Sequence, residues 1–207
     1  RDVWETLMSK LPATLLLMAS SVLVTLLISV PLGTLAAVKQ NRWADYVIRV
    51  LSFMGNSMPG FFAAVVLIWF FCIKLGWFPV ITSEDTLKSL VLPTLTLAIS
   101  MASKYTRQIR AAVLEELNQD YVVGAYARGV KYRVILWKNV MRSTLLTILT
   151  LLSLSIGSLL GGTTIVETIF MWDGVGKMAV DAINMRDYPI VQAYVVWMAV
   201  IYMLLNL

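Results

Sequence analysis

The chain has 207 residues, of which 59% are hydrophobic and 14% are charged, and its mean hydropathy is +0.78. Soluble domains usually carry about a quarter charged residues, so this composition excludes an ordinary soluble domain and predicts an integral membrane protein. The chain has no histidine and a single cysteine, Cys72. This excludes a disulfide within the chain and argues against a transition-metal site.

The charged residues are clustered, and the uncharged runs between them indicate the helices. A helix needs roughly 20 apolar residues to cross a bilayer, and four of the runs reach that length. The run 89–103 is shorter, but Lys88 and Lys104 flank it and can extend to the two interfaces. The sequence therefore predicts an all-α, polytopic membrane helix bundle with about five transmembrane helices, in the runs 11–38, 50–73, 89–103, 143–166 and 188–207.

The two ends of the sequence lead us to expect a fragment of a longer protein. It starts at Arg1 without an initiator methionine or a signal-peptide pattern, and it stops at Leu207 inside the last apolar run. We expect one transmembrane domain over 1–207, truncated at both ends. The helix count of the full-length protein is left open.

Basic residues sort the loops into two groups. The segments 39–49 and 104–142 together hold 11 of the 17 Lys and Arg residues and 4 of the 12 Asp and Glu residues, a net charge of +7, and the rest of the chain carries −2. Cytoplasmic loops are enriched in Lys and Arg, so we expect both segments on the cytoplasmic side. Because the basic residues follow this topology and form no separate patch, nucleic acid is not an expected partner.

The long basic segment 104–142 is predicted to contain a short helix. Residues 104–117 extend the preceding span as a helix, Asp120 is a favourable N-cap, and Gly129 is the residue type favoured just past a helix C-terminus. This pattern predicts a helix over 121–128, followed by an amphipathic stretch over 131–142. Small residues in the short helix permit close approach of another surface. The segment is therefore either a docking protrusion for a soluble partner or a solvated interfacial loop.

Motifs in this segment and elsewhere resemble a known family. The run DYVVGAYARG at 120–129, followed by NVMRS at 139–143, is similar to the cytoplasmic loop of binding-protein-dependent ABC importer permeases. The subgroup serving dipeptides, oligopeptides and nickel complexes is also similar to this chain at LPATL (11–15), at GGTTIVETIFMWDGVGKMAVDAI (161–183) and at RDYPIVQ (186–192). Val123 stands where the broader signature has Glu, and Asn139 stands where the subgroup usually has His.

This resemblance implies a permease subunit of an ABC importer for di- or oligopeptides or a nickel chelate, working by ATP-driven alternating access in a bacterial or archaeal plasma membrane. The implied partners are two cytoplasmic ATPase subunits, a homologous permease subunit, an extracellular substrate-binding protein and membrane lipid. ATP and Mg would be bound by the ATPases, so the chain itself would hold no cofactor, metal or catalytic residue. By the same resemblance, the ATPase-docking residues are Asp120, Tyr121, Gly124, Ala125, Ala127, Arg128, Gly129 and Val130.

The sequence GVGK at 174–177 resembles the end of a phosphate-binding loop. The full pattern requires a Gly five residues before Gly176 and a Ser or Thr after Lys177. Met171 and Met178 occupy those positions, so we interpret this stretch as something other than a nucleotide site.

Several polar or small residues lie within or at the ends of the predicted spans and are candidates for the transport pathway or for helix packing. Glu167, near the outer end of its span, is expected to face water or to pair with a base such as Lys177. Pro59 is expected to kink its helix. Small residues on one face allow close helix approach, either within the subunit or against a second permease subunit. The whole candidate set is Asn56, Ser57, Pro59, Ser153, Gly157, Gly161, Gly162 and Glu167.

Two other classes of protein fit this sequence less well than a permease does. A secondary transporter or channel independent of an ATPase would call for charged residues at the membrane midplane, and the predicted spans carry none there. A membrane-embedded enzyme would need a nucleophile and base or a metal constellation, which this composition does not supply.

Overall fold

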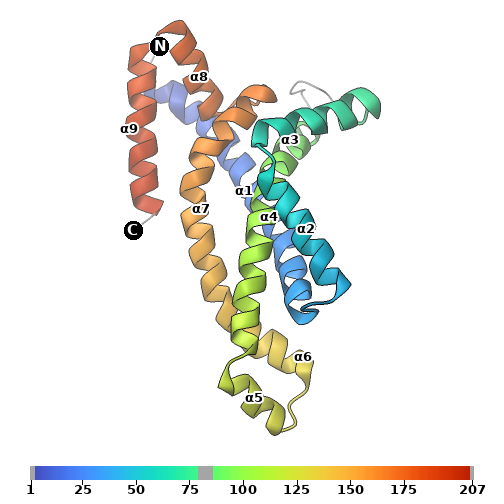
Figure 1. Ribbon diagram of the computed structural model, residues 1–207. Coiled ribbons are helices and arrows are strands. Elements are labelled where there is room, and N and C mark those ends of the chain that lie inside the picture. The colour runs from blue at the N-terminus through green and yellow to red at the C-terminus, as the bar shows by residue number, and fades with distance from the viewer. Residues whose placement is uncertain (1–2, 79–85, 206–207) are drawn as a thin grey trace. The chain divides into compact units, whose positions relative to one another are not determined.

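A computed structural model of the chain describes residues 3–78 and 86–205. Figure 1 shows that these residues form helices joined by short connections, and no strand occurs among them. The helices are α1 (Val3–Val38), α2 (Trp43–Ser57), α3 (Gly60–Leu67), α4 (Thr86–Leu117), α5 (Asp120–Ala127), α6 (Tyr132–Val134), α7 (Met141–Ile169), α8 (Val175–Met185) and α9 (Tyr188–Leu205), with π-helical segments η1 (Ile68–Lys74) and η2 (Ile135–Val140).

The predicted all-α membrane architecture is confirmed, but among the described residues only two or three stretches, not five, are long and apolar enough to cross a membrane. Among the described residues, the stretches Val3–Val38 and Tyr132–Gly157 are each long and apolar enough to cross a membrane. The pair formed by α2 and α3–η1 becomes a third if its broken halves are counted together. Helix α9 is apolar but shorter. The expected run 89–103 lies within α4, which is not among these candidates.

The chain breaks, rather than kinks, at Pro59. Helix α2 ends at Ser57 and α3 begins at Gly60, with Pro59 in an extended conformation between them. The Pro59 carbonyl accepts hydrogen bonds from the backbone N–H groups of Phe62 and Ala63, at 3.0 and 3.1 Å. Proline has no N–H of its own and disfavours a helical residue before it. The expected kink is therefore a helix end followed by a new helix start.

Packing divides the chain into two compact units. Unit 1 comprises residues 1–24, 58–100 and 153–207, and unit 2 comprises residues 25–57 and 101–152. Helices α1, α4 and α7 each contribute residues to both units.

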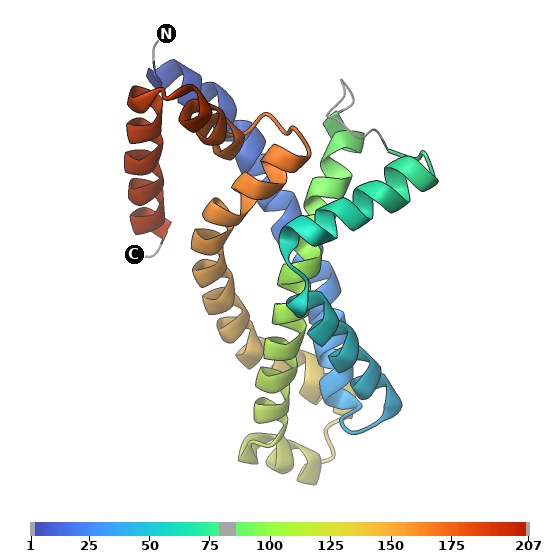
Figure 2. The same cartoon turned by 45° about the horizontal axis from the view of Figure 1, so that its top comes forward.

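The core of unit 1 forms around the loop that follows α7. Trp172 and Phe170, in this loop, are buried with Leu17 of α1, Leu97 of α4 and Ala64 of α3. The Trp172 indole N–H donates to the Ala13 carbonyl at 3.0 Å. Figures 1 and 2 both show α8 and α9 side by side near the start of α1, and the rings of Trp4 and Trp197 lie 5.0 Å apart.

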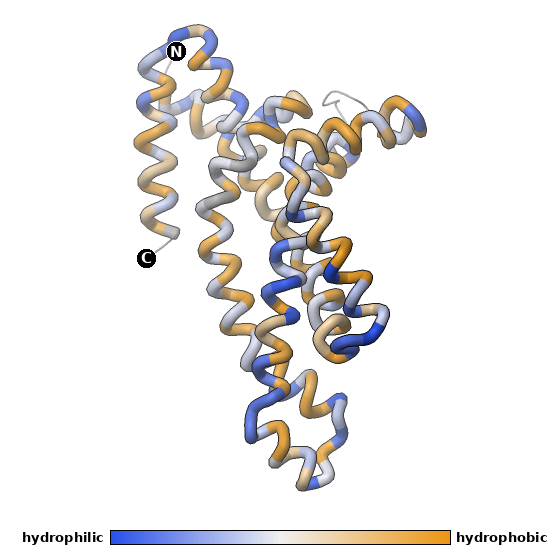
Figure 3. Tube along the Cα trace, in the orientation of Figure 1, coloured by the Kyte–Doolittle hydropathy of each residue, from blue (hydrophilic) through white to orange (hydrophobic). Residues whose placement is uncertain are grey.

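The core of unit 2 includes the short helix α5. Val122 and Ala125 of α5 are buried with Ile109 and Val113 of α4 and with Ile135 of η2. The Tyr105 hydroxyl on α4 donates to the Leu151 carbonyl on α7 at 2.8 Å. Figure 3 shows the hydrophilic segments of this unit at the turn between α1 and α2 and in the stretch around α5 and α6.

Candidate functional site

Helix α5 starts one residue earlier than the sequence pattern indicates. Gln119 is the N-cap, with an extended backbone (φ −77°, ψ 149°) and no capping hydrogen bond from its side chain. The predicted role of Asp120 as N-cap is therefore wrong, and Asp120 is the first helical residue. Its carboxylate still lies in the first turn, where negative charge interacts favourably with the helix dipole.

The C-terminus of α5 depends on Gly129, as the sequence indicates. Gly129 has φ +75°, a left-handed conformation that a residue with a Cβ adopts only at a cost. Its N–H bonds the Tyr126 carbonyl at 2.9 Å, and the Val130 N–H bonds the Ala125 carbonyl at 3.1 Å. This pair of hydrogen bonds is a Schellman motif, which satisfies carbonyls that the helix end leaves free.

The side chains of α5 divide into an inward and an outward face. Ala125 is 2% exposed and Val122 is 3% exposed, so both point into the unit 2 core. Val123 and Tyr126 are 63% and 53% exposed on the other side. Of the predicted docking residues, Asp120, Tyr121, Ala127, Arg128 and Gly129 are exposed, Gly124 and Val130 are half-buried, and Ala125 is buried. The Ala125 side chain therefore packs in the unit 2 core and is not on the exposed face of α5.

One docking residue is tied to the preceding helix. The Tyr121 hydroxyl donates to a carboxylate oxygen of Glu116 on α4 at 2.7 Å. Partial burial and this bond raise the pKa of Tyr121, so the hydroxyl keeps its proton for donation. The contact links the first turn of α5 to the end of α4.

A buried ion pair that the sequence reading missed joins α2 to α4. The Asp45 side chain has no exposed surface, and its two oxygens accept from the Nε and a terminal nitrogen of Arg110 at 2.7 and 2.8 Å. The Asn41 backbone N–H donates to the same carboxylate at 3.0 Å, and Arg49 lies 3.5 Å away. Arg110 holds the pKa of Asp45 below its ordinary value. The spacing of Asp45 and Arg49 was visible in the sequence, but the long-range partner Arg110 was not.

Glu167 is fully buried and binds the N-terminus of α8. One of its carboxylate oxygens accepts from the Thr14 hydroxyl at 2.8 Å, and the other accepts from the Lys177 backbone N–H at 3.0 Å. The Thr14 oxygen in turn accepts from the Val175 N–H at 2.9 Å. A carboxylate at a helix N-terminus satisfies free N–H groups and interacts favourably with the dipole. This contact, which we call the Glu167 clasp, joins α1, α7 and α8.

The clasp explains the glycines of the GVGK stretch. A Cβ at Gly174 would lie 2.4 Å from the Glu167 carboxyl carbon, and a Cβ at Gly176 would lie 2.7 Å from the Thr164 Cα. Gly174 is therefore required by the close approach of the Glu167 carboxylate, and Gly176 by the close approach of Thr164 on α7. Lys177 uses its backbone N–H toward Glu167, whereas its ammonium group pairs with Asp181 at 2.7 Å. The expected pairing of the Lys177 side chain with Glu167 is wrong.

The small residues of α7 have different surroundings. A Cβ at Gly157 would lie 2.3 Å from the ring of Tyr202 on α9, so Gly157 allows close packing within this chain. No described atom lies within 4 Å of the Cβ position of Gly161, and Ser153 is exposed. Gly162 is helical, and its surroundings fall outside the described part of the chain.

The remaining candidates lie at the break between α2 and α3. Asn56 and Ser57 are exposed in the last turn of α2, and the Ser57 hydroxyl donates to the Phe53 carbonyl at 2.9 Å. Pro59 is also exposed. Across the described ranges, no group of three His, Cys, Asp or Glu side chains is arranged to hold a metal ion.

Residues 29–207 match the family described as binding-protein-dependent transport system inner membrane component. The chain belongs to this family. An oligopeptide transport system permease protein, AppB of Bacillus subtilis (strain 168), is 39% identical to it over 99% of this chain and 68% of the relative. The glutathione transport system permease protein GsiC of Escherichia coli (strain K12) is 34% identical over 100% of this chain and 67% of the relative.

Solved structures show the same fold. Two inward-facing structures of the MetNI methionine ABC transporter superpose with TM-scores of 0.75 and 0.78. Their sequence identities are 19% and 17%, and the alignments cover 100% and 97% of this chain and 90% and 91% of theirs.

Family membership settles the class of the protein. The chain is a transmembrane permease subunit of an ABC importer and not an enzyme, and separate ATPase subunits hydrolyse ATP in such systems. It works with ATPase subunits, a permease partner and a binding protein. The secondary transporter or channel, kept as an alternative on the sequence alone, has no support.

Proposed function

We propose that α5 and the turn at Gly129 form the surface on which an ATPase subunit docks. The outward face of α5 carries two exposed, largely apolar side chains, Val123 and Tyr126. Both ends of the helix are fixed, by the bond from Tyr121 to Glu116 and by the Schellman motif at Gly129. A short, rigid helix with an exposed apolar face suits a groove on a soluble partner, because few side chains have to be ordered on binding.

The packing of α5 offers a route by which movement of an ATPase would reach the membrane helices. Val122 and Ala125 share one core with Ile109 of α4 and Val140, which directly precedes α7. A packed core resists compression and transmits displacement between its elements. Movement of α5 would therefore shift the adjoining parts of α4 and α7, which is the coupling that alternating access requires.

The charge distribution supports an orientation in which 39–49 and 104–142 face the cytoplasm. These segments carry a net charge of +7 and the rest of the chain carries −2, as the positive-inside rule requires. We place the protein in the plasma membrane of a bacterium or archaeon.

For the cargo, we propose a short peptide or a related small solute. The relatives described above are named for oligopeptide and glutathione transport, which favours a peptide over the nickel chelate that the resemblance also allows. The full assembly would contain a homologous permease subunit, two ATPase subunits that bind ATP and Mg, and an extracellular binding protein that delivers the cargo. This chain would hold no cofactor of its own.

Co-purification of the ATPase subunits with the chain tests the docking surface. Tyr126→Arg places a charge on the outward face of α5 and is expected to abolish retention of the ATPase. Met185→Arg is the matched control, since Met185 is 80% exposed on α8 and lies in unit 1, and it is expected to retain the ATPase. Full retention by the Tyr126 variant would refute the docking proposal.

A further inference from the structure

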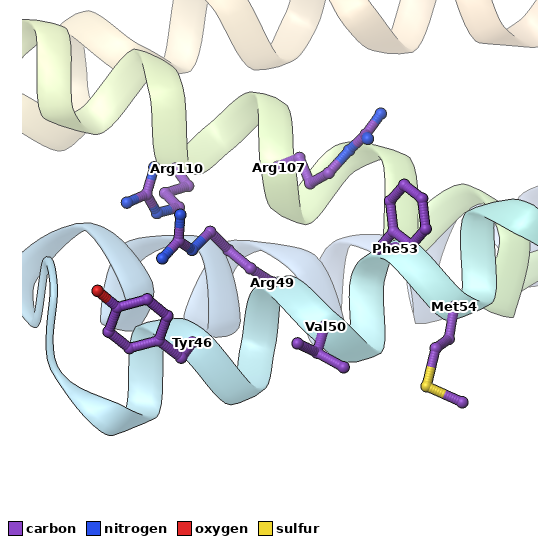
Figure 4. A pocket seen from close by; sticks show the side chains of 7 residues that line it. All are labelled: Tyr46, Arg49, Val50, Phe53, Met54, Arg107 and Arg110. Atoms are coloured by element: carbon purple, nitrogen blue, oxygen red, sulfur yellow. The ribbon is translucent and has the colours of Figure 1, made fainter.

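A cavity of about 600 Å³ opens between α2 and α4 in unit 2. Three arginines, Arg49, Arg107 and Arg110, line one part of it. Figure 4 shows that Arg49, from α2, and Arg110, from α4, extend toward each other, whereas Arg107 points away from this pair. The proposed transport mechanism assigns no role to this cavity.

The cavity carries an excess of positive charge. Asp45, buried beneath it, neutralises one unit of charge by pairing with Arg110 and lying 3.5 Å from Arg49. The Arg49 guanidinium also lies 4.7 Å from the centre of the Tyr46 ring. Arg107 has no carboxylate partner within the part of the chain that the structure describes. Three guanidinium groups against one carboxylate leave a site suited to an anion, with Arg107 free to bind it.

The other wall of the cavity is apolar and exposed. Val50, Phe53 and Met54 line it and are 58%, 65% and 58% exposed. Arg49 directly precedes the uncharged run 50–73, and Arg107 lies just past the uncharged run 89–103. The charged and apolar walls therefore meet where the membrane-embedded part of the chain ends, at the level of lipid headgroups.

We propose that this cavity binds an anionic phospholipid, with the phosphate at Arg107 and an acyl chain along Val50, Phe53 and Met54. Basic pockets between membrane helices on the cytoplasmic side recognise such headgroups. A soluble anion would bind the arginines but would make no contact with the apolar wall. A phospholipid contacts both walls at once, Arg107 through its phosphate and the apolar residues through an acyl chain. The site concerns lipid and not cargo, so it stands apart from the proposed peptide transport.

Lipid binding to the complete transporter tests the proposal. The complex, purified with its partner subunits in detergent, is titrated with phosphatidylglycerol, and bound lipid is counted by native mass spectrometry. One basic side chain at an anionic lipid surface is worth roughly fivefold in affinity. Arg107→Gln is therefore expected to weaken phosphatidylglycerol binding about fivefold, and Arg107→Lys is expected to keep most of it.

Two controls separate this site from general charge effects. Lys104→Gln removes the same charge three residues away on α4 and outside the cavity, and it is expected to weaken lipid binding clearly less than Arg107→Gln does. Phe53→Ser alters only the apolar wall, so it is expected to weaken phosphatidylglycerol binding without changing binding of glycerol phosphate. Inorganic phosphate at the same concentration is expected not to displace the lipid.

Three results would overturn the proposal. Equal losses in the Arg107→Gln and Lys104→Gln variants would mean that the effect is one of overall charge. Displacement of the lipid by inorganic phosphate would mean a site for free anions. Loss of the partner permease from the Arg107→Gln complex, with Arg107→Lys restoring assembly but not lipid binding, would mean that the cavity is part of a subunit interface.

Discussion

Two buried carboxylates, Asp45 and Glu167, are held by different kinds of partner. Asp45 binds a guanidinium group and a backbone N–H, so its charge is compensated by another side chain. Glu167 accepts hydrogen bonds from a hydroxyl and from the N-terminus of α8, so its oxygens are satisfied without a basic side chain. A buried charge is costly unless it is paired and hydrogen-bonded. Both residues should therefore matter for stability even though neither belongs to the proposed docking surface.

Replacing Glu167 by Gln is expected to destabilise the purified complex by about 1–3 kcal/mol. The amide would keep the size of the side chain, but its NH₂ group can only donate. It would face either the Lys177 N–H, which is itself a donor, or the Thr14 hydroxyl, whose oxygen already accepts a hydrogen bond from the Val175 N–H. The measurement is the apparent unfolding temperature. Glu115→Gln, the same change at an exposed position on α4, is the control. Equal unfolding temperatures for the two variants would contradict the role of the clasp.

The Asp45 ion pair predicts a specific pH dependence. Because Arg110 lowers the pKa of Asp45 in the folded chain, the pair contributes its full stability above the unfolded pKa of about 3.9. That contribution is lost as the pH falls through the lower folded pKa. The wild type should thus exceed Asp45→Asn in unfolding temperature by a constant margin near neutral pH. The margin should shrink in acid below about pH 4, and a margin independent of pH would contradict this account.

At the scale of the helices, α5 and α7 end in the same way. A residue in the left-handed conformation follows each helix, a glycine after α5 and a methionine after α7. Gly129 ends α5 with φ +75°, whereas Met171 follows α7 with φ +54°. Met171 donates to the Thr168 carbonyl and Trp172 donates to the Glu167 carbonyl, which repeats the hydrogen bonds around Gly129. The sequence signals this motif only where glycine occupies the left-handed position.

Two alanine substitutions in the α5 segment are expected to act in opposite directions. Gly129→Ala forces a Cβ into the left-handed conformation and should loosen the end of α5 by about 1 kcal/mol. Gly124→Ala places a Cβ in a helix interior whose nearest neighbour is an Arg128 nitrogen at 3.5 Å, so it should strengthen the helix by up to about 1 kcal/mol. Amide hydrogen exchange of residues 120–130 measures both. Slower exchange in the Gly129 variant would contradict the assignment.

The packing of α7 against α9 gives another matched pair. Gly157→Ala would bring a Cβ within 2.3 Å of the Tyr202 ring, and such overpacking typically costs about 1–3 kcal/mol. Gly161→Ala, in open space within the described part of the chain, should cost much less. Unfolding temperature of the complex is the readout, and adding Tyr202→Ala should rescue the Gly157 variant. Failure of that rescue would show that the Tyr202 ring is not the obstacle.

Much of the fold could be predicted from the sequence because hydrophobic runs and helix-end residues are local signals. Apart from the break at Met58 and Pro59, the uncharged runs lie in helices over the described residues, and Gly129 marks the end of α5. The π-helical segments η1 and η2 were not predicted, because no local residue pattern marks them. Pro59 did mark an interruption of its helix, but proline alone does not decide between a kink and a break. The N-cap of α5 was not predicted either. Asp120 is the better capping residue by type, yet the helix starts after Gln119.

The site was predictable where it rests on sequence motifs and not where it rests on long-range contacts. The short helix and its glycine were recognisable from residues 120–129. Its division into a buried face with Ala125 and an exposed face with Val123 and Tyr126 depends on how α5 packs against α4 and η2. Likewise, Glu167 was noticed as an acid near the end of its span and was expected to face water or a base, but it is buried and its partner Thr14 lies 153 residues earlier in the chain.

At the scale of the whole molecule, the chain is a permease subunit of a binding-protein-dependent importer. The chemistry of ATP hydrolysis lies in other subunits, so this chain has to receive movement rather than generate it. Helix α5 is the proposed point of entry, since it is exposed on one side and packed against α4 and η2 on the other.

Cross-linking of α5 to the ATPase tests this central claim most directly. The chain has one cysteine, Cys72, which is buried, so a new surface cysteine on this subunit can be modified selectively. In the assembled transporter, Tyr126→Cys carrying a short photo-activated cross-linker is expected to form a covalent product with the ATPase subunit. Met185→Cys, exposed on α8, is expected to form none. Cross-linking to the ATPase from position 185, or its absence at position 126, would contradict the account.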